Sequence, residues 1–484
     1  MEQLNTKVKK ATKWSGITEI MRRLIGPVTS MVLARLLTPD AFGVVTTLFM
    51  VISFAEIFTD AGFQKYIVQH EFKDETDQVQ STNVAFWSNF IMSMAIWGII
   101  AIFCDPLAEL VGSPGLGHVL IVAAACIPIA AFSSIQMALY RRALDFKTLF
   151  KVRIVGIVVP FLITIPLALW LRNYWALILG TLSQHTINAF LLTYYSKWKP
   201  QFFYSFAKLK EMISFTIWTM VESISIWLTN YVDVFIVGTM LSQHYLGLYK
   251  TSIVTVGHII GLITATTTPV LFSTLSRLQN DNSEFCKMYL SFQKMVGLLV
   301  IPLGVGIFCY SDFVTEVLLG DQWMEAAGFI GLWGLMGGLV CVFWHFNSVV
   351  FRAKGRPMLS ALLQIIQISC LVPVLLWSVR HGFHTLYVSC SLMRLNGILV
   401  SCIIVWFLVR LSFWRMFKNV IPIFVASGAM MAFAFALRSM SHSLVWNICT
   451  IALCILLYAG IIWLFPTERN ILKKHLLSFK HTRK

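Results

Sequence analysis

Long apolar runs separated by short polar connectors dominate this chain of 484 residues. Each run holds about 20 residues, which is enough for a helix to cross roughly 30 Å of hydrocarbon. The runs are continuous rather than alternating, which excludes the two-residue period of a membrane β-barrel. The pattern predicts an all-α polytopic membrane protein with about 14 transmembrane helices. We expect the spans near residues 17–37, 42–62, 84–103, 118–139, 152–171, 174–195, 213–238, 246–272, 295–311, 327–350, 358–378, 385–409, 418–437 and 444–465.

The basic residues are concentrated in every second connector. Those connectors and the two ends of the chain hold 29 lysines and arginines, whereas the opposite connectors hold only Arg172, Arg380 and Arg438. Because cytoplasmic loops carry the excess of basic residues, we predict that both termini are cytoplasmic. Membrane topology accounts for the net charge of +16, and no nucleic-acid partner is expected.

Composition narrows the class of function. Apolar residues make up 57% of the chain and no connector exceeds about 22 residues, which leaves no room for a soluble catalytic domain. The sequence has no Gly-Lys dipeptide for a nucleotide-binding P-loop and no Gly-x-Ser-x-Gly nucleophile motif. The ten cysteines show no metal-ligand spacing. We therefore predict a protein that moves its substrate rather than an enzyme, with no metal and no bound cofactor.

Two stretches at span boundaries indicate an internal repeat. Residues 36–43 and 240–247 match by residue class at six of eight positions, at an offset of 204, and acidic connectors at 105–112 and 312–320 follow at an offset of 207. Six spans separate equivalent points, so the copies would be parallel repeats; shared composition of equivalent loops is the alternative explanation. The predicted parts are an N-terminal lobe (1–200, spans 1–6), a C-terminal lobe (201–410, spans 7–12), two further helices (411–466) and a basic cytoplasmic tail (467–484).

Polar side chains form a stripe along span 7. Glu222, Ser225, Thr229 and Asp233 recur at helical spacing on one face, and Asn230 lies beside them. A charge near the bilayer centre costs about 2.5–3.5 kcal/mol, so such residues normally face a water-filled cavity or a partner. For Asp233, a role at the helix end is the alternative to a cation site. We predict that the stripe lines a substrate path.

Span 1, the repeat equivalent of span 7, carries Glu19, Arg22 and Arg23 on one face. Glu19 can neutralise either arginine at a spacing of three or four residues, and this local pairing is the alternative to a ligand site. Glu19 cannot neutralise both arginines, so one cation is left over for an anionic substrate.

Further charged residues lie within or at the ends of spans, and Arg394, about ten residues into span 12, is the deepest cation. A basic cavity suits an anionic substrate because guanidinium groups match phosphate oxygens. The candidate substrate path comprises Arg22, Arg23, Arg35, Lys250, Arg394, Ser225, Thr229 and Asn230. The candidates for ion coupling are Glu19, Glu222, Asp233 and Asp60, the last with a plain helix end as its alternative role.

Five segments carry a family resemblance: 34–43 (ARLLTPDAFG), 60–63 (DAGF), 233–238 (DVFIVG), 246–249 (LGLY) and 319–323 (LGDQW). They are similar to the signature of bacterial polysaccharide transporters. These form the branch of the multidrug/oligosaccharidyl-lipid/polysaccharide flippase superfamily that exports lipid-linked O-antigen, colanic acid or exopolysaccharide units. The resemblance covers about residues 1–430.

The resemblance implies two six-helix lobes that alternate between inward-facing and outward-facing states. It implies a cargo of oligosaccharide on undecaprenyl diphosphate, flipped across the bacterial cytoplasmic (inner) membrane by a proton or sodium gradient, for exopolysaccharide, lipopolysaccharide or capsule synthesis. The implied partners are this lipid-linked oligosaccharide, membrane lipids, and polysaccharide polymerase or export machinery. The alternatives are a cation-coupled multidrug exporter of the same superfamily, which would prefer an acidic cavity, and a membrane glycosyltransferase or polymerase.

Overall fold

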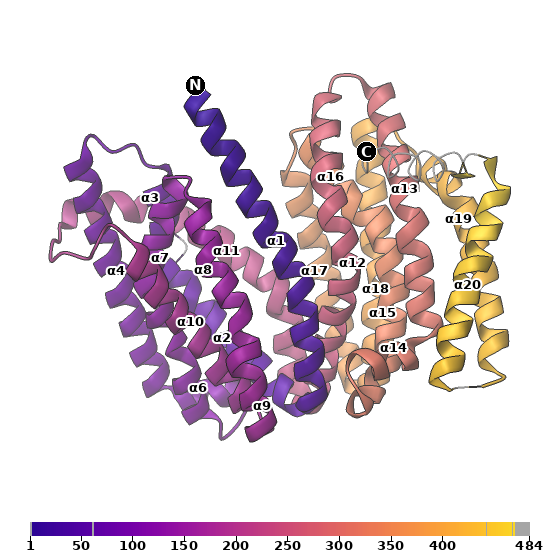
Figure 1. Ribbon diagram of the computed structural model, residues 1–484, viewed down its shortest axis with the longest axis horizontal. Coiled ribbons are helices and arrows are strands. Elements are labelled where there is room, and N and C mark those ends of the chain that lie inside the picture. The colour runs from indigo at the N-terminus through magenta and orange to yellow at the C-terminus, as the bar shows by residue number, and fades with distance from the viewer. Residues whose placement is uncertain (1, 61, 442, 467, 470–484) are drawn as a thin grey trace. The chain divides into compact units, whose positions relative to one another are not determined.

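The computed structural model describes residues 2–60, 62–441, 443–466 and 468–469, and the side chains of 2–13, 60, 214–219 and 221–222 lie outside that description. All regular secondary structure in these residues is helical, as predicted (Figure 1). Twelve of the described segments are long and apolar enough to cross a membrane. The other two predicted spans, 17–37 and 174–195, are helical but less apolar. The all-helical membrane class is therefore confirmed, and the count of 14 spans stays a prediction.

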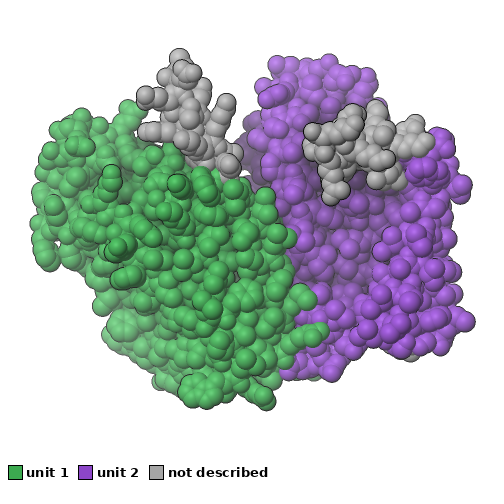
Figure 2. Space-filling model, in the orientation of Figure 1, with its two compact units in different colours: residues 1–250 green, residues 251–484 purple. Residues whose placement is uncertain are grey.

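The chain divides into two compact units, residues 1–250 and 251–484 (Figure 2). The first unit extends past the lobe boundary predicted at residue 200, because α11 and the first two turns of α12 pack with it. The division into lobes of 1–200 and 201–410 stays a prediction. The helices that begin in the first unit are α1 (Glu2–Leu36), α2 (Pro39–Asp60), α3 (Phe63–Gln69), α4 (Glu75–Ile102), α5 (Cys104–Leu110), α6 (Gly117–Ala124), α7 (Cys126–Arg142), α8 (Phe146–Val159), α9 (Ile165–Leu171), α10 (Trp175–Tyr195), α11 (Phe206–Met240) and α12 (Gln243–Arg277), with a π-helical turn at Pro160–Thr164.

The second unit contains the rest of α12 and eight further α-helices. Short 3-10 segments at Asp321–Ala326 and Val379–His381 and a π-helical turn at Cys341–His345 connect some of them. The helices are α13 (Asn282–Cys309), α14 (Ser311–Leu318), α15 (Ala327–Val340), α16 (Phe346–Ala353), α17 (Met358–Ser378), α18 (Phe383–Val409), α19 (Phe413–Arg438) and α20 (Leu444–Leu464).

Local sequence signals set several helix ends. Proline fits the first position of a helix, where α2 begins at Pro39, and the Thr38 hydroxyl accepts a hydrogen bond from the first turn of that helix. Asp74 and Asp281 cap α4 and α13 by accepting hydrogen bonds from free backbone N–H groups. At the C-terminal end of α18, Arg410 adopts a left-handed conformation with φ 56°.

Helix lengths recur at the spacing of the predicted repeat. Helices α1 and α11 end at Leu36 and Met240, at the same offset as the stretches 36–43 and 240–247. Helices α4 and α13 are each 28 residues long, and their starts at Glu75 and Asn282 have the offset of the acidic connectors. The short helices α5 and α14 follow them at that same offset. These recurring lengths support the predicted repeat.

Apolar cores within each unit fix the helices that carry the candidate sites. In the first unit, Met212 near the start of α11 is buried with Phe63, Tyr66 and Phe86 of α3 and α4. In the second unit, α19 and α20 pack on α13 and α14 through a cluster that includes Cys309, Ala434 and Cys454. Burial of this apolar surface places α11 with the first unit and the two C-terminal helices with the second.

Candidate functional site

Helices α11 and α12 are joined by only two residues, so they form a tight hairpin. Asp233 lies about two turns before the bend and Lys250 about two turns after it, each about 10 Å from the bend along the helix axis. The Tyr249 hydroxyl donates to Asp233 Oδ2 at 3.1 Å. Lys250 Nζ lies 3.4 Å from the carbonyl oxygen of Asn230 and 5.5 Å from the centre of the Tyr231 ring. The hairpin thus gathers an acid, an amine and two phenols in one cluster.

The rest of the predicted stripe on α11 has hydrogen-bond partners within the same helix. The Thr229 hydroxyl donates to the carbonyl oxygen of Ser225 at 3.0 Å, and the Asn230 side chain donates to that of Ile226 at 2.9 Å. The side chain of Glu222 lies outside the described residues. The structure therefore brings Asn230, Asp233 and Lys250 together, whereas Ser225 and Thr229 contribute to the stripe from farther along the helix.

On α1, Glu19 contacts both neighbouring arginines. Its Oε1 lies 2.8 Å from Arg23 Nε and its Oε2 lies 3.4 Å from Arg22 Nε. The carboxylate thus contacts both guanidinium groups, since Arg22 Nη2 also lies 3.4 Å from Oε1, but its single charge can neutralise only one of them. One net positive charge remains on this face. Of the other candidates near the first two spans, Arg35 is exposed in the last turn of α1, and the side chain of Asp60 lies outside the described residues.

In the second unit, Arg394 of α18 lies over the ring of Trp333 from α15. The guanidinium carbon is 4.1 Å from the ring centre, and Nη1 donates to the carbonyl oxygen of Trp333 at 3.3 Å. Gly337, one turn further along α15, packs closely on α12, since a Cβ there would lie 2.4 Å from Ile260 Cδ1 and 3.8 Å from Arg394 Nη1. An aromatic face stabilises a desolvated cation and leaves its charge in place.

An apolar pocket of about 390 Å³ also lies in the second unit, between α13, α19 and α20. Leu299, Pro302, Met430 and Ile455 are among the residues that line it. A pocket of this size and character accommodates a segment of hydrocarbon chain.

The two matching stretches, residues 36–43 and 240–247, lie against each other in the first unit. A Cβ at Gly43 would overlap the carbonyl oxygen of Gln243, and a Cβ at Gly247 would overlap that of Pro39. Only glycine permits so close an approach of one backbone to another. We call Pro39, Gly43, Gln243 and Gly247 the glycine crossing.

Polar contacts flank the glycine crossing. Asp40 Oδ2 lies 3.2 Å from His244 Nδ1. The side-chain amide of Gln243 donates to Ser113 Oγ at 3.0 Å, and Ser113 Oγ lies 2.8 Å from the Thr47 hydroxyl. The starts of α2 and α12 and the connector after α5 are therefore tied together at one end of the first unit.

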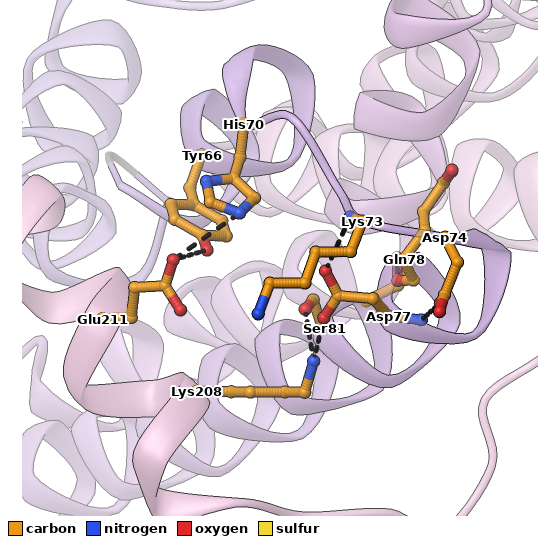
Figure 3. A network of polar contacts seen from close by, with 10 residues as sticks. Tyr66, His70, Lys73, Asp74, Asp77, Gln78, Ser81, Lys208 and Glu211 are labelled. Atoms are coloured by element: carbon orange, nitrogen blue, oxygen red, sulfur yellow. Dashed lines mark hydrogen bonds and ion pairs between the residues drawn. The ribbon is translucent and has the colours of Figure 1, made fainter.

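At the start of α11, a second polar group joins this helix to α3 and α4 (Figure 3). The Tyr66 hydroxyl donates to Glu211 Oε1 at 3.0 Å, His70 Nε2 lies 3.5 Å from the same oxygen, and the two rings stack. The Lys208 ammonium pairs with Asp77. Burial and the hydrogen bond to Glu211 raise the pKa of Tyr66. We call Tyr66, His70, Asp77, Lys208 and Glu211 the charged cluster.

Sequence reasoning missed the charged cluster. Its two main contacts join residues 145 and 131 positions apart, Tyr66 with Glu211 and Asp77 with Lys208. The available signal was the presence of acidic residues at 74–77 opposite basic ones at 208–210, in connectors predicted on the same side of the membrane.

The fold is shared with solved transporters. The structure of the lipid II flippase MurJ, in an inward closed conformation, matches with a TM-score of 0.74 at 14% identity, covering 94% of this chain and 99% of that one. Likeness at this identity shows the fold alone. With twelve described segments long and apolar enough to cross a membrane, the chain has the fold of a multi-pass membrane protein.

Residues 32–328 match the polysaccharide biosynthesis protein family, and the chain belongs to that family. The succinoglycan biosynthesis transport protein ExoT of Rhizobium meliloti is 22% identical over 335 residues, 69% of this chain and 67% of that one. The lipopolysaccharide biosynthesis protein WzxC of Escherichia coli is 21% identical over 382 residues, 77% of this chain and 75% of that one. The predicted family is confirmed, and it is a family of membrane transport proteins rather than enzymes.

Proposed function

We propose that this protein is a flippase that carries oligosaccharide units linked to undecaprenyl diphosphate across the bacterial cytoplasmic membrane by alternating access. Membership of the polysaccharide biosynthesis family supports transport for surface polysaccharide, as do the roles of ExoT and WzxC. The five sequence segments that resemble those of lipid-linked oligosaccharide exporters support an undecaprenyl-diphosphate-linked cargo. In this scheme the two repeats act as the alternating lobes, and both termini are cytoplasmic.

The observation that carries the proposal is that each unit holds a basic side chain over an aromatic ring inside a predicted span. These pairs are Lys250 with Tyr231 and Arg394 with Trp333. The ring stabilises the cation without neutralising it, so the charge can attract phosphate oxygens in surroundings of low dielectric constant. A diphosphate cargo fits such cations, and a cationic drug would be repelled by them.

Asp233 is the group best placed for ion coupling in this scheme. It accepts hydrogen bonds from Tyr249 and from the backbone N–H of Val234 in the same hairpin that holds Lys250. Binding a proton or a sodium ion at Asp233 would change the net charge beside Lys250, and with it the attraction for an anionic cargo. This links a gradient of either ion to cargo binding.

Complementation of a deletion strain tests the proposal. Deletion should leave lipid-linked repeat units in the cytoplasmic leaflet and stop surface polymer, and the wild-type gene should restore export. Lys250→Met and Arg394→Gln should each lower export by about tenfold or more, since each removes a cation from a predicted span. Lys418, which lies over Trp414 at the start of α19, gives the matched control, and Lys418→Met should restore export fully.

Normal surface polymer in a deletion strain without redundant carriers would overturn the flippase assignment. Increased sensitivity to cationic drugs with unchanged polymer would instead identify a multidrug exporter. If both cation variants were fully active, the flippase assignment would stand, but the proposal that the cargo contacts Lys250 and Arg394 would be overturned.

A further inference from the structure

The connector between α10 and α11 folds back onto one face of α4, seen beside α4 in Figure 1. The backbone N–H of Gln201 donates to Asn83 Oδ1 at 3.1 Å, and Trp87 Nε1 donates to the carbonyl oxygen of Gln201 at 2.9 Å. The hydroxyls of Tyr204 and Ser88 lie 3.1 Å apart. Hydrogen bonds at both ends of residues 201–204 therefore hold this segment in a fixed place.

The fixed segment forms one wall of an aromatic pocket. The ring of Phe202 stacks on Trp87 with centroids 4.9 Å apart, yet Phe202 is 95% exposed. Together with Phe90, Ile91 and Met94 of α4, these rings line a pocket of about 660 Å³. Phe202 lies in a connector outside the predicted spans, so its exposed ring adds an apolar wall beside the lipid-facing side chains of α4.

A second apolar pocket, of about 320 Å³, continues from the first. Phe90 lines both, and Pro128 and Phe132 of α7 line the second one. Pro128 lies about four turns before the end of α7 at Arg142, or about 21 Å along the helix. Half the hydrocarbon core of a bilayer is about 15 Å thick. The predicted span ends at residue 139, about 17 Å along the helix from Pro128, so on this placement the two pockets form a groove about as deep as one leaflet.

The interfacial end of the groove is basic. Between residues 196 and 211 the chain has four lysines, at 197, 199, 208 and 210, against the single acid Glu211. Lys208 is paired with Asp77, whereas Lys197 and Lys210 are exposed. Lysines at this position next to membrane spans attract anionic lipid headgroups.

We propose that this groove binds one acyl chain of an anionic phospholipid, with the headgroup phosphate at the lysines of the connector. The length of the groove favours a membrane phospholipid, whose chain occupies one leaflet, over a longer polyprenyl carrier. The site lies within the first unit and differs from the candidate cargo path. The proposal therefore goes beyond the flippase function and does not depend on it.

Photolabelling of the purified full-length protein tests the proposal. The probes are phosphatidylglycerol and phosphatidylcholine that carry the same photoactivatable group in the acyl chain, and labelled peptides are mapped by mass spectrometry. We expect phosphatidylglycerol to label residues 87–94 and 128–132 about tenfold more strongly than phosphatidylcholine. Excess unlabelled phosphatidylglycerol should compete.

Three variants sharpen this test. Phe202→Ala should lower labelling of residues 87–94 about fivefold, since it removes one wall of the pocket. The matched control is Phe190→Ala, an exposed phenylalanine on α10 outside both pockets, which should leave labelling unchanged. The double variant Lys197→Gln/Lys210→Gln should abolish the preference for phosphatidylglycerol while retaining labelling.

Equal labelling by the two headgroups would show ordinary lipid contact and overturn the proposal. Competition by a polyprenyl phosphate but not by phosphatidylglycerol would assign the groove to the carrier lipid and would also overturn it. Because the readout is binding, loss of the flippase assignment would leave these results unaffected.

Discussion

The glycine crossing and the charged cluster both hold α11 and the start of α12 within the first unit, but they do so by different physics. In the crossing, backbone lies against backbone with no side chain between them. In the charged cluster, long polar side chains meet at the surface, and Glu211 remains 56% exposed. Close packing of backbones tolerates almost no added volume, whereas exposed polar contacts contribute little each and can rearrange. The crossing should therefore be the rigid attachment and the charged cluster the adjustable one.

The largest expected effect is from adding a methyl group at the crossing. Gly43→Ala and Gly247→Ala should each destabilise the protein by about 1–3 kcal/mol, because the new Cβ forces two backbones apart. Thermal unfolding of the detergent-purified protein measures this. Gly257→Ala is the control in the same helix, where no atom lies within 4 Å, and it should be neutral or stabilise by up to about 1 kcal/mol. Equal melting temperatures for all three variants would show that the glycine crossing tolerates added volume and is not a rigid attachment.

A smaller effect is expected at the ion pair of the charged cluster. A double-mutant cycle with Lys208→Met and Asp77→Asn should give a favourable coupling energy that decreases with added salt. The two side chains are 20% and 22% exposed, so solvent screens the pair only in part. The exposed pair Lys287–Glu284 provides the comparison and should give a smaller coupling energy. A coupling energy for Lys208–Asp77 no greater than for this control would show that the ion pair does not attach α11 to α4.

The charged cluster should also give stability a dependence on alkaline pH. The folded state raises the pKa of Tyr66, so above about pH 10 the unfolded chain loses a proton that the folded chain keeps. The protonated Tyr66 hydroxyl therefore makes its full contribution to the free energy of unfolding below about pH 10, and this contribution is lost as the pH rises. Tyr66→Phe should reduce the decline in stability between about pH 10 and 12. Tyr194→Phe, at a side chain that is 70% exposed, should leave the decline unchanged.

The smallest effect is expected at Asp40 and His244. Asp40 is 61% exposed in this pair, so His244→Gln should change stability by less than about 1 kcal/mol, even though it lies at the crossing. If His244→Gln lowered the free energy of unfolding as much as Gly247→Ala does, the contact of Asp40 with His244, rather than the glycine contact, would hold the crossing.

The sequence predicts the features that depend on local pattern. Apolar runs of span length and the excess of lysine and arginine in alternate connectors are visible in any window of the chain. The match of residues 36–43 with 240–247 locates the starts of α2 and α12, where Pro39 and Gln243 begin their helices. Helix type and boundaries follow from these signals because each needs only neighbouring residues.

Contacts between distant segments were not available from the sequence. The match of 36–43 with 240–247 gave position only, and the approach of Gly43 to Gln243 depends on how α2 and α12 pack. Tyr66 and Glu211 come together because Met212 is buried beside α3. Even the local pairing of Glu19 was predicted only in part, since spacing shows which arginines are within reach but not that both are held at once.

In the glycine crossing, each of the two stretches supplies the same two positions. Pro39 and Gln243 occupy equivalent places in the two stretches, as do Gly43 and Gly247. Gly43 meets Gln243, and Gly247 meets Pro39, so each glycine contacts the helix-starting residue of the other stretch. This exchange is the geometry of a homodimer about a two-fold axis, in which residue i touches residue j and j touches i. Residues 36–43 and 240–247 therefore contact each other in the way that two identical subunits contact each other in a homodimer. A half-length chain that carried one copy would therefore possess a self-complementary surface, and a change designed at one position of the crossing should be paired with the same change at its equivalent in the other stretch.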